Sequence, residues 1–337
     1  MRNKFILVFL LLMNIHFIYA KSNVLKNHSI NKSTIYIMLT MKNGYTLLGT
    51  KEGLKVLHNK NFQVPTFKAK KNMSIYTISE QEDGKIIIGG NFDTVNGHKI
   101  KDIVRLNMDG SIDDSFMSDF DGFDGEIYDI EILKDHSILV GGYFTKLGHH
   151  TTSKGLVKLN ENGSIAVEYH DLTHYLISIV NDIHIVNNKI FLAGIFIKNK
   201  NEQQAILSVD KDGNLNKKFN QKVSAIQGNT FKIAVNKNNL VLIGDLSIKD
   251  NNVVSNVVKL NINGTINEHF HISGLSGFLY DVKYKPNTLM FAGELFIETK
   301  NKMTEVNLVQ YTNNKLIPLL VNNKTKSYTL DYIKEGK

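Results

Sequence analysis

The chain has 337 residues, of which 42% are hydrophobic and 21% charged, a composition typical of a globular protein rather than a disordered one. It contains no cysteine, which excludes disulfides, thiolate metal sites and a cysteine nucleophile. The formal net charge is +8, and lysine supplies nearly all the positive charge because Arg2 and Arg105 are the only arginines. Lysine is poorly suited to bidentate contacts with bases or phosphates, so the composition argues against a nucleic-acid-binding protein.

The N-terminus has the layout of a secretory signal peptide. Arg2 and Lys4 precede an apolar run from Phe5 to Met13, and Ala20 ends the segment. The run is shorter than the ~20 residues that a membrane span needs. We therefore expect residues 1–20 to be a signal peptide cleaved after Ala20, with an uncleaved anchor as the alternative. The mature protein would then be secreted or periplasmic and would have no membrane span.

Short apolar runs that end in glycine recur along the rest of the chain at intervals of about fifty residues. The glycines are Gly49, Gly90, Gly142, Gly194, Gly244 and Gly293. A second landmark, usually an aromatic residue, opens an alternating run 13 or 14 residues before each glycine. These landmark residues are Tyr36, Tyr76, Tyr128, Asn181, Phe231 and Tyr280. The alternation predicts a β-strand at each landmark.

A turn pair follows each glycine after about twenty residues, beginning with the second repeat. The pairs are Asp109-Gly110, Asn162-Gly163, Asp212-Gly213 and Asn263-Gly264, with a degenerate version at Asn313-Asn314. Asp-Gly and Asn-Gly between β-type runs are the strongest short-range hairpin signal, because both central residues of the expected turn need positive φ. Each unit therefore contains four β-type runs, and we expect helix to be scarce.

A four-stranded unit repeated at this period predicts an all-β protein with the fold of a β-propeller. We expect six four-stranded blades, with seven as the alternative, in a single domain over residues 34–337. Packing such small sheets face to face around an axis buries both faces of each sheet. The repeats are 34–74, 75–126, 127–179, 180–229, 230–278 and 279–326, after a lead-in at 21–33 and before a closing strand at 327–333.

Three segments between Asp83 and Ile132 carry a resemblance to a known family. DGKIIIGGNF, IVRLNMDGSIDDSF and FDGFDGEIYDIEI are similar to the delta-60 repeat, a bacterial repeat of propeller type. The resemblance is closest over 75–126 and weakens through 180–320. It implies the fold and an exported context but no enzyme activity. The kelch repeat is the second candidate, although it normally adds a tryptophan and this chain has none.

The strand order separates two kinds of connection. In an up-and-down sheet the short turns lie at one end of the strands, the turn face, and the other connections lie at the opposite end, the loop-rich face. We expect the loop-rich face to bind a partner, because function concentrates on loops held by a rigid scaffold. Its connections within units are 91–102, 143–154, 197–204, 247–256 and 297–305, and those between units are 117–126, 168–178, 221–228, 271–277 and 320–326.

Histidines in these connections are the first candidates for a binding site. They are His98, His149, His150, His170 and His174. A metal or a pH-sensitive contact would use them, and solvated loop histidines are the alternative, because their spacing is not diagnostic of a metal site.

Residues that follow the landmark aromatics are the second set of candidates. If the first strand of each unit is innermost, these side chains surround the axis and form either a polar site for an ion or small ligand or a hydrated channel. They are Thr77, Asp129, Asp182, Lys232 and Asp281, and the three aspartates are the binding candidates.

Two acidic features complete the survey of possible chemistry. The carboxylates between Asp119 and Glu126 suggest Ca²⁺, but Phe123 stands where an EF-hand needs an oxygen ligand, and an ordinary turn between units is the alternative. Asp245 and Glu294 form the best carboxylate pair for acid–base chemistry, without identifiable partner residues. We expect no metal and no cofactor.

The lysines of the loop-rich face favour an acidic protein or an anionic glycan at the cell envelope, with a merely solubilising surface as the alternative. The sequence therefore predicts an exported, non-catalytic binding or scaffold protein that recognises a protein or glycan and no nucleic acid. One alternative is a propeller-type glycan hydrolase or lyase, which needs two carboxylates or a histidine–carboxylate pair converging on the axis. The other is a purely structural envelope protein.

Overall fold

A computed structural model describes residues 35–321 except 58–61, 71, 118–120, 153, 168–171, 173, 250–252, 286–287 and 300–301. The expected signal peptide (1–20), lead-in (21–33) and closing strand (327–333), as well as His170, lie outside the described residues. Within them the chain is dominated by β-strands, with one short helix, α3 (Lys217–Lys222). No helix in this part of the chain is long and apolar enough to cross a membrane.

Six of the eight sheets follow one plan, in which a first strand pairs antiparallel with a second and the second with a third. The first three are β1 (Ile35–Thr40), β2 (Thr46–Thr50) and β3 (Gly53–Leu57); β5 (Ser74–Glu80), β6 (Ile86–Asn91) and β9 (Ile103–Leu106); and β10 (Glu126–Ile132), β11 (Ile138–Tyr143), β14 (Leu156–Leu159) and β15 (Ile165–Val167). The last three are β16 (Ile177–Val186), β17 (Lys189–Asn199) and β18 (Glu202–Val209); β19 (Ile226–Val235), β20 (Asn239–Ile248) and β21 (Val253–Asn261); and β22 (Leu275–Lys285), β23 (Thr288–Thr299), β24 (Lys302–Thr312) and β25 (Lys315–Val321).

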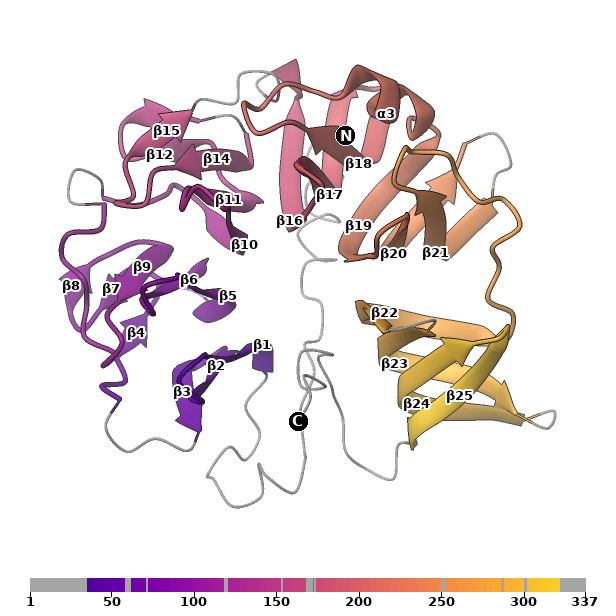
Figure 1. Cartoon of the computed structure of the whole chain (residues 1–337), viewed down its shortest axis with the longest axis horizontal. Coiled ribbons are helices and arrows are strands. Elements are labelled where there is room, and N and C mark those ends of the chain that lie inside the picture. Colours follow the sequence, from indigo (N-terminus) through magenta and orange to yellow (C-terminus); the bar gives the residue numbers. More distant parts are fainter. Residues whose placement is uncertain are drawn as a thin grey trace.

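These sheets are arranged around a common centre, and the first strand of each lies innermost (Figure 1). Hydrophobic clusters fill the spaces between consecutive sheets. Leu47 of β2 and Ile75 of β5 share one cluster, and Ile87 of β6 and Ile130 of β10 share the next. A small twisted sheet has two apolar faces to bury, and one hydrophobic cluster lies between each pair of consecutive sheets here. The protein is therefore all-β and of the propeller type, as the repeat predicts.

The fourth strand is shorter than the sequence pattern suggests. It is an extended segment in two sheets, as β15 and β25, and elsewhere in the described residues it shrinks to single bridges, Leu106–Ile112, Val209–Leu215 and Leu260–Ile266. The expectation of four full strands in every unit is wrong for those three. The Leu106–Ile112 bridge consists of two backbone hydrogen bonds, from Asn107 to the carbonyl of Ser111 at 2.8 Å and from Asp113 to the carbonyl of Arg105 at 2.9 Å.

Every innermost strand has a shift in register at its landmark residue, so that one extra residue is inserted there. In β10 the shift lies between Ile127 and Asp129, at Tyr128. The strand-end glycine lies against this bulge: a Cβ added at Gly142 would be only 2.1 Å from the carbonyl oxygen of Glu126. Glycine recurs at this point of the last five repeats because the bulged strand leaves no room for a side chain, whereas the first repeat has Thr50 opposite Ile35.

The Asp-Gly and Asn-Gly hairpins differ in detail from the expected turn. Gly110 has a φ of +89°, but Asp109 is not among the residues with positive φ. Asn107 donates its N–H to the carbonyl of Ser111, so the loop holds three residues and only its glycine is left-handed. The expectation of two positive φ angles is wrong here. It holds for the degenerate pair Asn313-Asn314, with φ of +48° and +59°.

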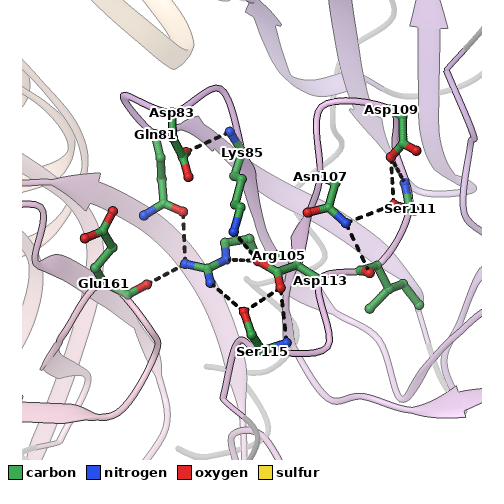
Figure 2. Close-up of polar contacts among 11 residues, drawn as sticks. Gln81, Asp83, Lys85, Arg105, Asn107, Asp109, Ser111, Asp113, Ser115 and Glu161 are labelled. Atoms are coloured by element: carbon green, nitrogen blue, oxygen red, sulfur yellow. Dashed lines mark hydrogen bonds and ion pairs between the residues drawn. The ribbon is translucent and has the colours of Figure 1, made fainter.

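Arg105 connects the second and third repeated sheets on the turn face (Figure 2). Its side chain is 5% exposed, its Nε donates to Asp113 at 2.8 Å, and its Nη1 donates to the carbonyl of Glu161 in the hairpin of the next unit. The guanidinium carbon also lies 4.7 Å from the ring centre of Phe116. Burial opposes ionisation of Asp113, but Ser115, Lys85 and Arg105 outweigh it and lower the pKa of this carboxyl. Arg105 therefore stabilises the contact between two sheets.

Candidate functional site at the axis and the loop-rich face

The candidates that follow the landmark aromatics connect neighbouring sheets at the axis. Asp129 of β10 accepts the backbone N–H of Ile183 on β16 at 2.7 Å. Asp182 of β16 accepts the backbone N–H of Ile233 on β19 at 2.8 Å. Thr77 of β5 donates to Asp129 at 3.5 Å. These side chains therefore form a polar belt along the innermost strands.

Asp182 is the centre of an ion-pair network in this belt. Lys232 Nζ lies 2.7 Å from its Oδ1, and His184 Nε2 lies 3.4 Å from its Oδ2. The side chain of Asp182 is 5% exposed, whereas those of Lys232 and His184 are each 37% exposed. Burial opposes ionisation of Asp182, but Lys232 and His184 outweigh it and lower the pKa to about 2. Burial likewise opposes protonation of His184, but Asp182 raises its pKa to about 9.

Glu131 and Asp129 hold their protons more tightly than ordinary carboxyls do. Burial raises the pKa of Glu131 to about 8, and the charge of Asp129 adds to the effect. Burial also raises the pKa of Asp129 to about 6, against the attraction of Lys232. The pKa of Glu131 is therefore raised and that of Asp182 lowered within one network.

Sequence reasoning missed Glu131 and His184. Each lies two residues after a predicted candidate, Asp129 or Asp182, and alternate residues of a strand share a face. That spacing is a signal the sequence contains. The third aspartate, Asp281, occupies the corresponding place on β22, where its Oδ1 accepts the N–H of Val282 at 2.8 Å and its charge helps to raise the pKa of Lys232.

The landmark tyrosines form a second belt beside the first. The ring centres of Tyr36 and Tyr76 are 5.1 Å apart, those of Tyr76 and Tyr128 are 5.5 Å apart, and both contacts are edge to face. Glu126, at the start of β10, accepts a hydrogen bond from Asn91 Nδ2 at 2.9 Å. Both Tyr76 and Tyr128 also interact with this carboxyl, and burial raises the pKa of both phenols.

The loop-rich face consists largely of β-hairpins. In the second and third units the connections form small hairpins, β7 (Thr94–Val95) with β8 (His98–Lys99) and β12 (Lys146–Leu147) with β13 (His150–Thr151). β7 also pairs with β4 (Phe67–Lys68). In the later units the second and third strands simply extend, as in β17 and β18, which pair out to Asn199 and Glu202. The expected loop at 197–204 is therefore mostly strand.

The described histidines of this face lie apart in the chain and are exposed. His98 is on β8, His149 and His150 belong to the next small hairpin, and His174 lies in a connection between units. No group of three or more histidine, aspartate or glutamate side chains in the described part of the chain is placed to hold a metal ion. The structure thus brings Asp129 and Asp182 into one network but not these histidines.

The acidic run before β10 has contacts of the kind that an ordinary turn makes. Asp124 accepts hydrogen bonds from the backbone and hydroxyl of Thr145 at 2.7 Å and from the backbone of Lys146 at 2.8 Å. Asp121 pairs with Lys99 at 2.7 Å. Both carboxylates are thus engaged in joining the chain to neighbouring loops. Residues 118–120 of the run lie outside the described part.

Asp245 and Glu294, the carboxylate pair considered for acid–base chemistry, lie on β20 and β23, the second strands of neighbouring sheets. Asp245 is the cross-strand partner of Asn229, and Glu294 that of Phe278. Burial raises the pKa of Asp245.

Comparison with known proteins gives one family match and distant structural likenesses. The family described as "Domain of unknown function (DUF5122) beta-propeller" matches residues 81–116. The match falls where the resemblance to the delta-60 repeat is closest and agrees with the propeller class, while the narrower resemblance stays a prediction. A comparison with curated proteins gives no match.

Among solved structures, the chain is similar to the WD40 β-propeller domain of Doa1, with 12% identity, a TM-score of 0.42 and coverage of 86% of this chain and 90% of that one. It is similar to PorZ, a surface component of the type-IX secretion system of Porphyromonas gingivalis, with 11% identity, a TM-score of 0.40 and coverage of 86% and 45%. For XC5397, a gluconolactonase from Xanthomonas campestris, the values are 10%, 0.38, 75% and 88%. The chain thus spans less than half of PorZ, and likenesses this distant say nothing about its activity.

Proposed function

We propose that the protein is an exported, non-catalytic binding or scaffold protein that recognises a protein or a glycan through its loop-rich face. The observation that carries this proposal is the contrast between the two faces. On the turn face the hairpins are short and internally bonded, as in the loop from Asn107 to Ser111. On the loop-rich face hairpins project from the sheets and expose polar side chains such as His98 and Lys99. A rigid scaffold that presents exposed hairpins is suited to recognition.

We further propose that the sheets form a closed ring of six blades, with 327–333 as the closing strand and seven blades as the alternative. Leu48 of β2 is fully buried although it lies outside the cluster between the first two repeated sheets. Met290 and Ala292 of β23 are buried outside the cluster that faces the preceding sheet. Burial on these outer faces of the first and last sheets supports closure.

Export and an envelope location belong to the same proposal and depend on the signal-peptide pattern at residues 1–20. An acidic protein and an anionic glycan are the partner classes that the lysines of this face favour. Some of these lysines are already neutralised, since Lys198 lies 3.5 Å from Glu202 and Lys99 2.7 Å from Asp121. A purely structural envelope protein remains the alternative if the face proves to have no ligand.

The His184–Asp182 pair is the observation in favour of the enzymatic alternative, because a glycan hydrolase or lyase needs such a pair near the axis. The other contacts of Asp182 argue for a structural role, since its two oxygens also hold Lys232 Nζ and the backbone N–H of Ile233. A carboxylate engaged in this way is poorly placed to exchange a proton with a substrate. We therefore retain a non-catalytic function.

The proposal is tested with the chain from Lys21, linked to a photo-crosslinker and incubated with envelope material of the producing cell. In one variant alanine replaces the exposed side chains of His98, Lys99, His149, His150 and Lys200, which leaves the buried Leu147 in place. In the control variant alanine replaces the exposed side chains of Met108, Glu161, Lys211 and Asp212 on the turn face, which keeps the backbone carbonyl of Glu161 that Arg105 binds. We expect the first variant to lose its crosslinked partner and the control to keep it, with equal circular dichroism and melting temperature. Crosslinking that survives replacement of the side chains on the loop-rich face would refute the proposal.

A further inference from the structure

We propose that the inner end of the loop-rich face, where β5, β6 and β10 meet, binds a neutral glycan. This inference rests on the proposed function and names the ligand class of one part of the same face. The site, here called the tyrosine–carboxyl site, combines hydroxyl, amide and carboxyl groups with one exposed aromatic ring. It consists of Tyr76, Asn91, Asp102, Glu126, Tyr128 and Tyr143.

Glu126 lies at the centre of the site. Its Oε1 accepts a hydrogen bond from Asn91 Nδ2 at 2.9 Å, and both Tyr76 and Tyr128 hydrogen-bond to the same carboxyl. Tyr143 is its direct cross-strand partner on β11. Burial raises the pKa of Glu126 although all three hydrogen bonds oppose the shift. The groups around Glu126 thus include both donors and acceptors, which the hydroxyls of a sugar require because each hydroxyl can donate and accept.

The backbone of Asp102 adopts a left-handed conformation that belongs to a glycine at the corresponding position of the next unit. Its φ is +63°, and the corresponding residue of the next unit is Gly155, with φ of +76°. The two residues make the same backbone contact: Asp102 donates to the carbonyl of Phe92 at 2.9 Å, and Gly155 to that of Phe144 at 3.0 Å. A non-glycine residue in the left-handed region costs free energy, and such strain concentrates at functional sites.

The side chain of Asp102 is suited to both donating and accepting a hydrogen bond. Asp102 is 9% exposed, and its Oδ1 accepts the N–H of Phe92 at 3.2 Å. Burial raises its pKa to about 8, and the charges of Asp93 and Glu126 act in the same direction. Its backbone is tied to the same strand as Asn91, because Gly90 donates its N–H to the carbonyl of Asp102 at 3.0 Å.

Tyr143 supplies the apolar contact that sugar recognition needs. It is 52% exposed although it follows the buried end of β11, so one side of its ring faces solvent. Aromatic rings bury a large area at small entropic cost and pack against the C–H face of a pyranose. An exposed ring directly opposite a carboxyl places the stacking and hydrogen-bonding groups of the site side by side.

Electrostatics select a neutral glycan over charged ligands. An anionic sugar would meet Glu126 and Asp93, which act on Asp102 as negative charges. A cationic ligand carries only donors, so it would compete with Asn91, Tyr76 and Tyr128 for the carboxyl of Glu126. An uncharged polyhydroxylated ligand avoids both the repulsion and the competition.

The test is isothermal titration calorimetry of the chain from Lys21 with maltopentaose, mannopentaose and the tetramer of N-acetylglucosamine. A heparin octasaccharide and tetralysine serve as anionic and cationic probes. We expect at least one neutral oligosaccharide to bind, and its binding to be unchanged when either charged probe is present. If no neutral oligosaccharide binds, or if only a charged probe binds, the inference is wrong.

Three variants locate the binding. Glu126→Gln and Tyr143→Ala should each weaken the binding of that oligosaccharide by about tenfold, the effect of losing one good hydrogen bond or ring contact. Asp102→Gly should weaken it to a similar degree without lowering the melting temperature, because glycine relieves the backbone strain. Weaker binding at an unchanged melting temperature would separate a role of Asp102 in binding from a role in stability.

Phe278→Ala is the matched control. Phe278 is 64% exposed and is the cross-strand partner of Glu294, so it repeats the aromatic–carboxyl pair on another sheet. Equal loss of binding in Phe278→Ala would place the ligand elsewhere and overturn the inference. If no oligosaccharide binds but the intact loop-rich face still captures its crosslinked partner, the glycan site fails and the proposed function stands.

Discussion

Asp129 and Ile183 are joined across two sheets, because the carboxylate of the first accepts the backbone N–H of the second at 2.7 Å. The same contact recurs one unit later between Asp182 and Ile233. In both cases the donor directly follows the bulge of an innermost strand. A backbone N–H beyond the bulge is thus directed toward the preceding sheet, where an aspartate at the corresponding position accepts its hydrogen bond. Asp182 additionally forms an ion pair with Lys232.

Replacement of Asp182 should destabilise the protein more than replacement of an exposed aspartate. Asp182→Ala removes the acceptor of the Ile233 N–H and the counter-charge of Lys232. We expect a loss of about 2–3 kcal/mol in the free energy of unfolding, less than for a fully buried pair because Lys232 is partly exposed. Urea denaturation measures the change. Asp212→Ala, in an exposed turn, is the control and should lie within about 0.5 kcal/mol of the parent. Equal losses in both variants would contradict the role of Asp182.

The network should make stability decline in alkaline solution. His184 has its pKa raised from 6.5 to about 9, so its stabilising contribution is complete below pH 6.5 and is lost as the pH rises through about 9. Glu131, raised from 4.5 to about 8, acts in the same direction, because the unfolded chain releases this proton at lower pH than the folded one.

We expect the melting temperature to fall between about pH 6 and about pH 9, and His184→Gln to fall less steeply over that window. Thermal unfolding followed by circular dichroism measures both slopes. His149→Gln, which changes an exposed histidine, should keep the slope of the parent. A His184→Gln slope equal to that of the parent would show that this imidazole is not linked to folding.

Gly142→Ala should be strongly destabilising. The new Cβ would lie 2.1 Å from the carbonyl oxygen of Glu126, so the bulge of β10 must move. We expect a loss of about 3 kcal/mol, the upper part of the range for overpacking. Gly97→Ala is the control, since nothing lies within 4 Å of its added Cβ and only its φ of +82° opposes alanine. That variant should lose only about 1 kcal/mol in urea denaturation. If Gly142→Ala proves no worse than the control, the close approach does not explain the glycine period.

Arg105→Lys should destabilise the contact between the second and third repeated sheets although it keeps the charge. Lysine cannot reproduce the planar set of donors that Arg105 uses toward Asp113 and Glu161. We expect a loss of about 1–2 kcal/mol in the free energy of unfolding. Lys259→Arg tests the equivalent position three units later, where Lys259 Nζ lies 5.2 Å from the ring centre of Phe270, and should be neutral or stabilising. A neutral Arg105→Lys would mean that charge alone is needed.

Much of the fold was predictable because two of its landmarks have local physical causes. In the last five repeats, the glycine near the end of the second strand and the landmark residue of the first strand meet at the same bulge, as at Gly142 and Tyr128. Their regular spacing in the sequence therefore corresponds to a contact in the structure. The turn pairs likewise located hairpins correctly. The type of turn was not predictable from the pair alone, since Asp-Gly suits both a two-residue and a three-residue loop, and Asn107 decides between them through its bond to Ser111.

The candidate site was predictable only in part. The position after each aromatic identified Asp129 and Asp182, because it is fixed by the repeat itself. Their neighbours Glu131 and His184 share one position of the repeat, but the residue type there changes from unit to unit, so only their place two residues after Asp129 and Asp182 points to them. Asp102 was overlooked because its positive φ is a property of the backbone that the residue type does not reveal. Its correspondence with Gly155 is also hidden in the sequence, because both residues lie in loops between strands. The histidines of the loop-rich face were chosen by residue type, which does not show whether their side chains lie close to one another.

The links between Asp129 and Ile183 and between Asp182 and Ile233 all point the same way along the chain: a carboxylate reaches forward to the amide of the unit that follows. The repeat that contains Asp182 and Ile183 therefore has one acceptor for its successor and one donor for its predecessor. Duplication of such a unit within the gene would add both the acceptor and the donor of a new hydrogen bond between sheets. No second mutation would then be needed to join the inserted unit to its neighbours.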